Sequence, residues 1–147
     1  TLFRSKSFPL RKFFFILVFI AIGVTISDQL ASIFKHGIQR FRPCHDELLM
    51  EKMRMVICGG NFGFYSAHAS SSFFVATFVS ILLGKKYKYL SIIVFVWASL
   101  VSYSRIYLGV HFPFDVVFGA LVGFLLGGFL AELTKKVIYK NQLISNS

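Results

Sequence analysis

The sequence is poor in charge, and above all in acidic residues. Only 15% of its 147 residues are charged, and 6 Asp and Glu stand against 16 Lys and Arg. Soluble domains carry about 25% charged residues, so the composition does not fit an ordinary soluble domain. Cysteine is scarce too, and the set Cys44, His45 and Cys58 is too sparse to predict a zinc site.

The sequence is rich in apolar residues where a soluble domain would have charged ones. The chain is 56% hydrophobic, with a mean hydropathy of +0.70, which excludes a disordered chain. A formal charge of +10 is common in nucleic-acid-binding proteins, but that class needs a polar domain to carry the charge. The remaining class is an integral membrane protein, in which basic residues set the orientation. We expect no nucleic-acid partner.

Four apolar segments predict the architecture, at residues 13–34, 68–84, 87–103 and 113–133. A membrane helix needs about 20 residues, which the first and last segments reach and the middle two narrowly miss. None alternates apolar with polar residues as barrel strands do. A signal peptide over residues 1–26 is disfavoured, because the apolar run is too long and no cleavage site follows. We expect one all-α domain over residues 1–147, a polytopic transmembrane helical bundle.

The basic residues predict the orientation of this bundle. Lys and Arg occur without acids in residues 1–12 and 85–88, and they follow Glu132 in the tail. These regions lie on one side if each segment crosses the membrane once. The positive-inside rule places that side in the cytoplasm, so the stretches 35–65 and 104–112 face outward.

The outward loops hold a set of polar residues with complementary chemistry: Lys35, Arg42, Ser66, His68, Arg105, His111 and Asp115. Three cations with hydroxyl and amide donors suit a phosphoryl group, whose transition state spreads negative charge over several oxygens. Two histidines can divide the remaining work, one attacking phosphorus and the other giving a proton to the leaving oxygen.

The spacing of these residues forms three motifs in order. They read Lys35-x6-Arg42-Pro43, then Tyr65-Ser66-Ala67-His68, then Ser104-Arg105-x5-His111-x3-Asp115. The series resembles the signature KxxxxxxRP, PSGH and SRxxxxxHxxxD of the type 2 phosphatidic acid phosphatase superfamily, which also includes vanadium haloperoxidases. The resemblance spans residues 35–115, and it departs at Tyr65 and Ala67, where the family has Pro and Gly.

The resemblance implies a role for each matched residue. His111 would be the nucleophile that forms a phosphohistidine, and Asp115 would orient it. His68 would protonate the leaving group and then activate water. The phosphate would be held by three cations, one hydroxyl and one backbone N–H, from Lys35, Arg42, Arg105, Ser66 and Ala67. No metal or other cofactor is implied.

The resemblance also implies a fold and a reaction. Family members often have six core helices, so the four segments would be the last four, and the chain would be truncated at its N-terminus. The implied enzyme is a metal-independent membrane phosphatase acting on a lipid phosphate or diphosphate. Undecaprenyl diphosphate, phosphatidylglycerol phosphate and lipid A phosphates are examples, if the source is bacterial. The site would then face the periplasm or exterior of the inner (plasma) membrane.

Two other functions stay open. A non-catalytic membrane protein that binds anionic lipid would keep the helices and cations without hydrolysis. A haloperoxidase-like enzyme shares the pocket but is disfavoured by the membrane helices.

Further polar residues have competing interpretations. Asp28 lies within the first segment and predicts either an ion pair to a phosphate-binding cation or a packing hydrogen bond. Cys44 and Cys58 form either a disulfide or two free thiols. Other cations and histidines of the long loop are interpreted as solvated or snorkelling surface residues: Arg40, Lys52, Arg54, His36 and His45.

Small residues repeat along the last segment. Gly119, Gly123 and Gly127 recur every four residues, a spacing that lets membrane helices approach closely. We expect this stripe to pack inside the bundle beneath the site, with a homodimer contact as the alternative.

Overall fold

The fold is entirely helical. The structure, a computed structural model, describes residues 10–52 and 57–145. Its elements run α1 (Leu10–Ile38), η1 (Pro43–His45), α2 (Glu47–Met50), α3 (Ala67–Leu83), α4 (Leu90–Tyr107) and α5 (Pro113–Ser145). The four long helices confirm the four predicted segments, and two short helices, η1 and α2, lie in the long loop between α1 and α3.

Three helix ends differ from the predicted bounds. The helix α1 continues beyond residue 34 to Ile38, so Lys35 lies in its last turn. The helix α4 runs to Tyr107 and includes Arg105, which the sequence analysis placed in a connecting loop. The helix α5 extends to Ser145, well past the apolar stretch. In each case the helical backbone continues after the hydropathy falls, because its hydrogen bonds do not require apolar side chains.

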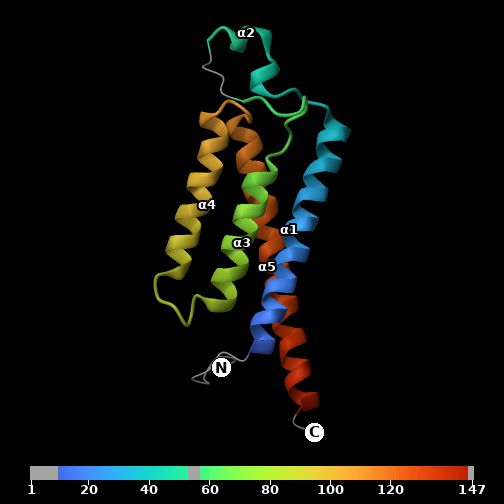
Figure 1. The fold of residues 1–147 in the computed structure, drawn as a ribbon, viewed down its shortest axis with the longest axis vertical. Helices are drawn as coiled ribbons and strands as arrows, with labels where there is room; N and C mark the ends of the chain where they lie inside the picture. The colour runs from blue at the N-terminus through green and yellow to red at the C-terminus, as the bar shows by residue number, and fades with distance from the viewer. Residues whose placement is uncertain (1–9, 53–56, 146–147) are drawn as a thin grey trace.

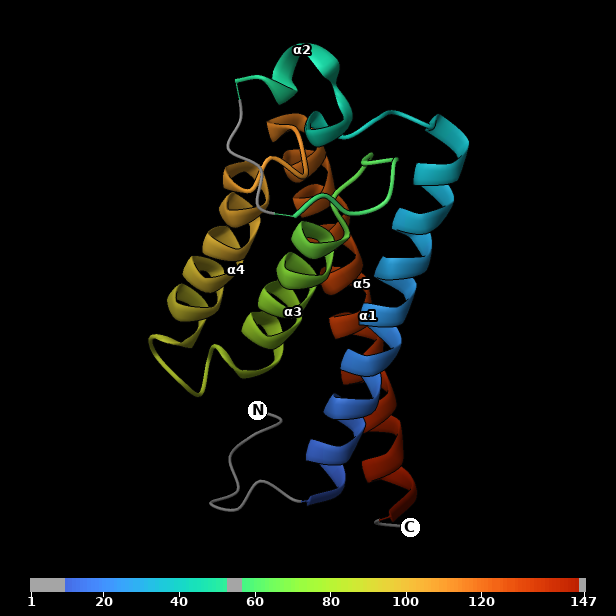
Figure 2. The same ribbon diagram turned by 45° about the horizontal axis from the view of Figure 1, so that its top comes forward.

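The helix α3 is the centre of the bundle. It contacts α5 most extensively and also packs against α4 and α1, while α1 and α5 lie side by side (Figures 1 and 2). One apolar core cluster joins Phe74 and Phe78 of α3 to Ile16 of α1 and Leu130 of α5. This packing brings together, at one end of the bundle, the C-terminal ends of α1 and α4 and the N-terminal ends of α3 and α5.

The glycine stripe of α5 faces α3. A Cβ added at Gly119 would lie 2.5 Å from Ser66 O, and one at Gly127 would lie 2.7 Å from Phe74 O. At Gly123 an added Cβ would overlap Ser70 O. Only glycine permits this approach, since any side chain would push the helices apart. The stripe therefore packs inside the bundle as predicted, and the homodimer alternative is wrong for this face.

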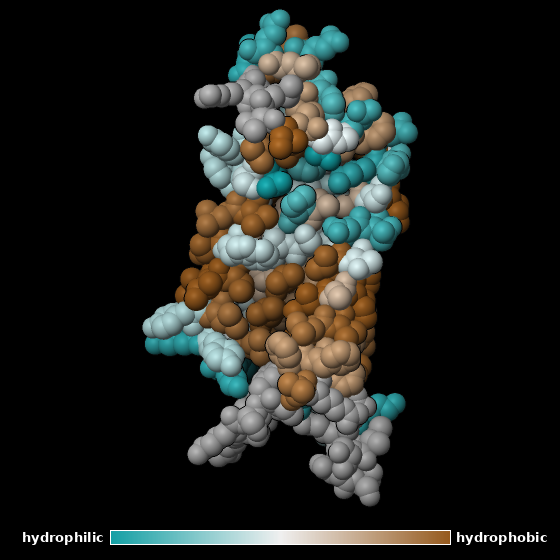
Figure 3. Space-filling model, viewed as in Figure 1, coloured by the Kyte–Doolittle hydropathy of each residue, from teal (hydrophilic) through white to brown (hydrophobic). Residues whose placement is uncertain are grey.

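Three described helices are long and apolar enough to cross a membrane: residues 12–38, 90–107 and 113–140. The helix α3 is a shorter apolar helix of 17 residues, in line with its slightly short segment. On the face shown in Figure 3, an apolar band covers the middle of the molecule, and hydrophilic residues gather above it, over the end that carries α2. These features fit an integral membrane protein.

Charge is distributed as the predicted topology requires. Lys12 lies in the first turn of α1, and Lys135 and Lys136 lie in the last third of α5. The turn between α3 and α4, which carries Lys85 and Lys86, lies at the same end of the bundle (Figure 1). The long loop and the turn before α5 lie together at the opposite end.

Candidate functional site

The N-terminus of α3 supplies His68 and Ala67. Ser66 is the N-cap, and its Oγ accepts a hydrogen bond from the Ala69 N–H at 3.3 Å. Capping by serine satisfies one of the free N–H groups of the first turn. The remaining first-turn N–H groups and the helix dipole favour an anion at this end. Ser66 is itself fully buried, so its side chain lies behind the pocket surface.

The end of α1 and a short extended segment supply Lys35 and Arg42. The helix stops where Gln39 adopts a φ of 52°. The chain then pairs with a later part of the same loop: the Arg42 N–H donates to Asn61 O at 3.1 Å, and Arg42 Nε donates to Phe62 O at 3.3 Å. An added Cβ at Gly63 would lie 2.9 Å from Arg42 Cγ, so glycine makes room for the arginine.

The end of α4 supplies Arg105 and turns the chain back to His111. Gly109 has a φ of 69°, a conformation that glycine adopts without strain. The Val110 N–H donates to Arg105 O at 3.2 Å, and the Gly109 N–H donates to Ile106 O at 2.9 Å. This pair of bonds is the Schellman pattern that ends many helices. The local sequence therefore fixes His111 close to the end of α4.

Asp115 lies one helical turn beyond His111, at the start of α5. Its carboxylate is fully buried, and His111 is 3% exposed. Asp115 Oδ2 accepts from the Phe112 N–H at 2.9 Å and lies 3.7 Å from His111 Nδ1. That separation is within ion-pair range but longer than a hydrogen bond. His111 lines the pocket and Asp115 does not, so the carboxylate contacts the imidazole from the side away from the pocket.

One pocket of about 360 Å³ collects most of the predicted residues. Six of them line it: Lys35, Arg42, Ala67, His68, Arg105 and His111. Ile57, Gly59, Leu108 and Val110 complete the wall. Ser66 and Asp115 lie behind this lining. Residues from four separate parts of the chain therefore meet at the end of the bundle that carries the long loop.

The electrostatics of the pocket favour an anion and a neutral nucleophile. Burial lowers the pKa of the His111 imidazole below its ordinary value of 6.5, and the nearby Arg42 and Lys35 act in the same direction. The Asp115 carboxylate opposes them. A neutral imidazole keeps a lone pair for attack on phosphorus, and the cations offer charge to the phosphate oxygens.

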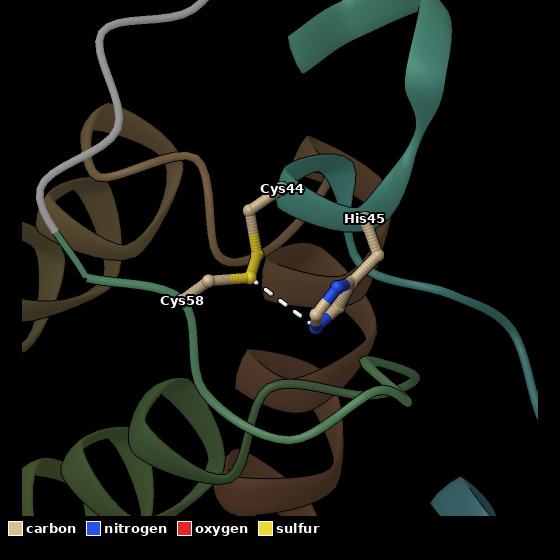
Figure 4. Close-up of side chains that lie close together, drawn as sticks. All are labelled: Cys44, His45 and Cys58. Atoms are coloured by element: carbon tan, nitrogen blue, oxygen red, sulfur yellow. Dashed lines mark hydrogen bonds between the residues drawn. A yellow bond between two sulfur atoms is a disulfide. The ribbon is translucent and has the colours of Figure 1, made fainter.

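A disulfide between Cys44 and Cys58 closes the long loop, and it decides between the two interpretations of these cysteines (Figure 4). His45 Nε2 lies 3.3 Å from Cys58 Sγ and 3.3 Å from Gly59 O. The atoms of Cys44, His45 and Cys58 that could bind a metal ion lie within 4.8 Å of one another. Zinc binds cysteine as the thiolate. Because both sulfur atoms are bonded to each other in the disulfide, neither is a thiolate in this structure.

Two sequence-based interpretations are wrong. Arg40 was interpreted as a solvated or snorkelling cation, but its Nη2 forms an ion pair with the buried Asp115. Of the two alternatives for Asp28, the ion pair is wrong, because Asp28 is exposed and the ion pairs formed among residues 10–52 and 57–145 do not include it. Nothing in the spacing of the motifs indicated the pairing of Arg40 with Asp115, because Arg40 occupies an unspecified position within the first of them. Lys52 and His36 are exposed as predicted, and Arg54 lies outside the described residues.

Comparison with known proteins gives related sequences. Residues 12–139 match the PAP2 superfamily. The lipid A 4'-phosphatase of Bacteroides thetaiotaomicron is 39% identical over 111 residues, which cover 73% of this chain and 48% of that protein. The lipid A 4'-phosphatase of Porphyromonas gingivalis is 37% identical over 137 residues, 90% of this chain and 56% of that protein. The chain thus spans about half the length of these relatives.

A solved structure agrees with the sequence matches. The crystal structure of a PAP2-type phosphatidylglycerolphosphate phosphatase from Bacillus subtilis superposes with a TM-score of 0.66 at 28% identity. The match covers 82% of this chain and 59% of that one. All three motifs lie within residues 12–139, the part of the chain that matches the family. The chain belongs to the PAP2 superfamily, in its membrane-bound lipid phosphatase branch.

Proposed function

We propose that this protein hydrolyses a phosphate monoester or diphosphate carried by a membrane lipid, through a phosphohistidine formed on His111. The observation that carries the proposal is the convergence of two imidazoles and three cations on one pocket at the end of an apolar bundle. The cations would bind the phosphate oxygens, and the apolar band would keep the lipid chains beside the site.

The first chemical step is an in-line attack. The neutral imidazole of His111 attacks phosphorus, a nitrogen–phosphorus bond forms, and the ester oxygen–phosphorus bond breaks. His68, which lines the same pocket, gives its proton to the leaving lipid oxygen. Lys35, Arg42 and Arg105 stabilise the charge that develops on the remaining oxygens.

Water completes the cycle. His68, now neutral, takes a proton from a water molecule, which attacks the phosphohistidine. The nitrogen–phosphorus bond breaks, inorganic phosphate leaves, and His111 is neutral again. The chemistry is balanced by the two histidines and water alone.

The substrate class we favour is a lipid A phosphate. Two relatives, 39% and 37% identical, are lipid A 4'-phosphatases. Phosphatidylglycerol phosphate and undecaprenyl diphosphate are the competing substrates. With the basic regions in the cytoplasm, the pocket faces the periplasm or exterior of a bacterial plasma membrane.

The test is phosphate release by the full-length protein in detergent. Lipid A, phosphatidylglycerol phosphate and undecaprenyl diphosphate are offered to the wild type, His111→Ala, His68→Ala and the control His36→Ala, whose side chain is exposed on α1. We expect a loss of about 10³-fold or more for His111→Ala and of about 10²–10⁴-fold for His68→Ala. The control should keep the wild-type rate.

The same experiment separates the alternatives. Equal release by the wild type and His111→Ala would overturn the mechanism. A folded wild type that releases no phosphate from any lipid, yet binds anionic vesicles, would make the protein a non-catalytic lipid-binding member of the family. Faster release from a lipid other than lipid A would correct the substrate and leave the chemistry intact.

A further inference from the structure

We propose that Arg40 is a positioning residue, which holds Asp115 and through it the nucleophile His111. The inference rests on the proposed function and adds a residue to it. Arg40 Nη2 donates to Asp115 Oδ1, although the two residues lie 75 positions apart in the chain. The side chain of Asp115 is fully buried, whereas 38% of the Arg40 side chain is exposed.

The carboxylate needs such a partner. A buried carboxylate without a counter-charge is strongly unfavourable, and no other described lysine or arginine lies within ion-pair distance of Asp115. Arg40 occupies Oδ1, and the Phe112 N–H occupies Oδ2 at 2.9 Å. Two donors from different parts of the chain therefore fix the plane of the carboxylate, with Oδ2 directed toward His111 Nδ1 at 3.7 Å.

The guanidinium of Arg40 is itself held between aromatic rings. Its Cζ lies 5.4 Å from the centre of the Phe64 ring and 5.0 Å from that of Phe112, distances typical of cation–π contacts. The backbone is held as well, because the Gly63 N–H donates to Arg40 O at 2.9 Å. A freely solvated arginine would need none of these contacts.

Arg40 acts from behind the pocket. It is absent from the residues that line the pocket, which include Lys35, Arg42 and Arg105. A phosphate in the pocket therefore meets those three cations, and Arg40 reaches the reaction only through Asp115. In this arrangement Arg40 weakens the pull of Asp115 on the His111 proton and keeps the imidazole aimed at phosphorus.

The charged groups around His111 define what the loss of Arg40 would change. They come from every neighbouring element: Lys35 on α1, Arg42 on the loop, His68 on α3, Arg105 on α4 and Asp115 on α5. Removing Arg40 leaves the other cations in place but gives Asp115 its full effect on the imidazole. The acidic limb of the activity profile should then move to higher pH.

The test compares Arg40→Gln and Arg40→Lys with the control Lys52→Gln, which changes an exposed cation of the same loop. We expect Arg40→Gln to lower kcat by about 10²-fold with a small change in KM, and to move the acidic limb upward. Arg40→Lys should restore part of the rate and the wild-type limb. Lys52→Gln should behave as the wild type.

Two results would overturn the proposal. One is a wild-type rate and pH profile in Arg40→Gln. The other is a lowered rate with an unchanged profile and no rescue by lysine, which would mean a purely structural role. An NMR titration of the His111 imidazole in the full-length protein repeats the comparison without turnover: its midpoint should rise in Arg40→Gln, and an unchanged midpoint contradicts the proposal. An inactive wild type would overturn the proposed function, while this titration still decides the role of Arg40.

Discussion

His111 is the residue whose surroundings say most about the chemistry. It is nearly buried, it faces two cations and a carboxylate, and burial lowers its pKa. A histidine that is neutral near pH 7 can act as a nucleophile, whereas an imidazolium cannot. In the proposed mechanism, the balance among burial, Asp115 and the cations therefore sets the lower pH limit of activity.

A pH profile tests this balance. Because the pKa of His111 is lowered, activity should persist as the pH falls through 6.5 and disappear only at lower pH. In Asp115→Asn the opposing carboxylate charge is gone, so the limb of the residual activity should move to still lower pH. Glu47→Gln, which changes an exposed acid, is the control and should leave the limb unchanged. A wild-type limb above pH 6.5, or an upward shift in Asp115→Asn, would contradict the account.

Most of the site residues could be predicted from the sequence, because motif spacing reflects the chemistry directly. His68, His111 and the three cations Lys35, Arg42 and Arg105 line one pocket. The pairing of Arg40 with Asp115 could not be predicted, because it depends on how the loop folds over the start of α5. The sequence could not decide whether Cys44 and Cys58 form a disulfide, because the distance between the two sulfur atoms also depends on how the loop folds.

At the scale of elements, the contact between α3 and α5 is the most extensive helix–helix contact in the bundle. The glycine stripe lets α5 lie against backbone atoms of α3, and α3 carries His68, which lines the same pocket as His111. The apolar segments predicted these helices, but their ends differ, since α1 and α5 continue into polar sequence.

Two glycines of α5 offer a matched pair of variants. Gly123→Ala should destabilise the protein by about 1–3 kcal/mol, because its Cβ overlaps Ser70 O. At Gly128 an added Cβ meets nothing within 4 Å, so Gly128→Ala should be neutral or stabilise the helix by up to about 1 kcal/mol. Thermal unfolding in detergent measures both. Equal melting temperatures for the two variants would contradict the packing described.

The disulfide should stabilise the loop that carries Arg42. Cys44 and Cys58 are separated by 14 positions, and closing a loop of this size contributes about 3 kcal/mol in the chain-entropy model. Reduction should lower the melting temperature and raise KM, because Arg42 lies two residues before the bridge. The double variant Cys44→Ser/Cys58→Ser is the control and should not respond to reductant. Full thiol labelling of the unreduced protein would contradict the bridge.

At the scale of the whole molecule, charge separates into two populations. The start of α1 and the basic turn between α3 and α4 lie at one end of the bundle, and the long loop that borders the pocket lies at the other (Figure 1). An apolar band lies between these ends on the face shown in Figure 3. We therefore interpret the net charge mainly as a signal of orientation, whereas the cations proposed to bind phosphate are distinguished by their spacing and by their meeting at the pocket. Composition excluded a soluble domain correctly but could not locate the site.

Reporter fusions test the orientation. A reporter fused after Lys140 should behave as cytoplasmic, and one fused after Lys52 as external, because basic flanks stay inside. Both fusions must be inserted to comparable levels for the comparison to hold. An external signal after Lys140 would reverse the topology and place the pocket on the cytoplasmic face.

The central claim is that phosphate passes through a covalent bond to His111. Full-length protein is mixed with lipid A labelled at its phosphate, quenched at alkaline pH within one turnover, and digested for mass spectrometry. The account predicts one alkali-stable, acid-labile phosphate on the peptide that contains His111, and none in His111→Ala. Label on another residue, or active turnover with no trapped phosphoenzyme under any quench time, would contradict it.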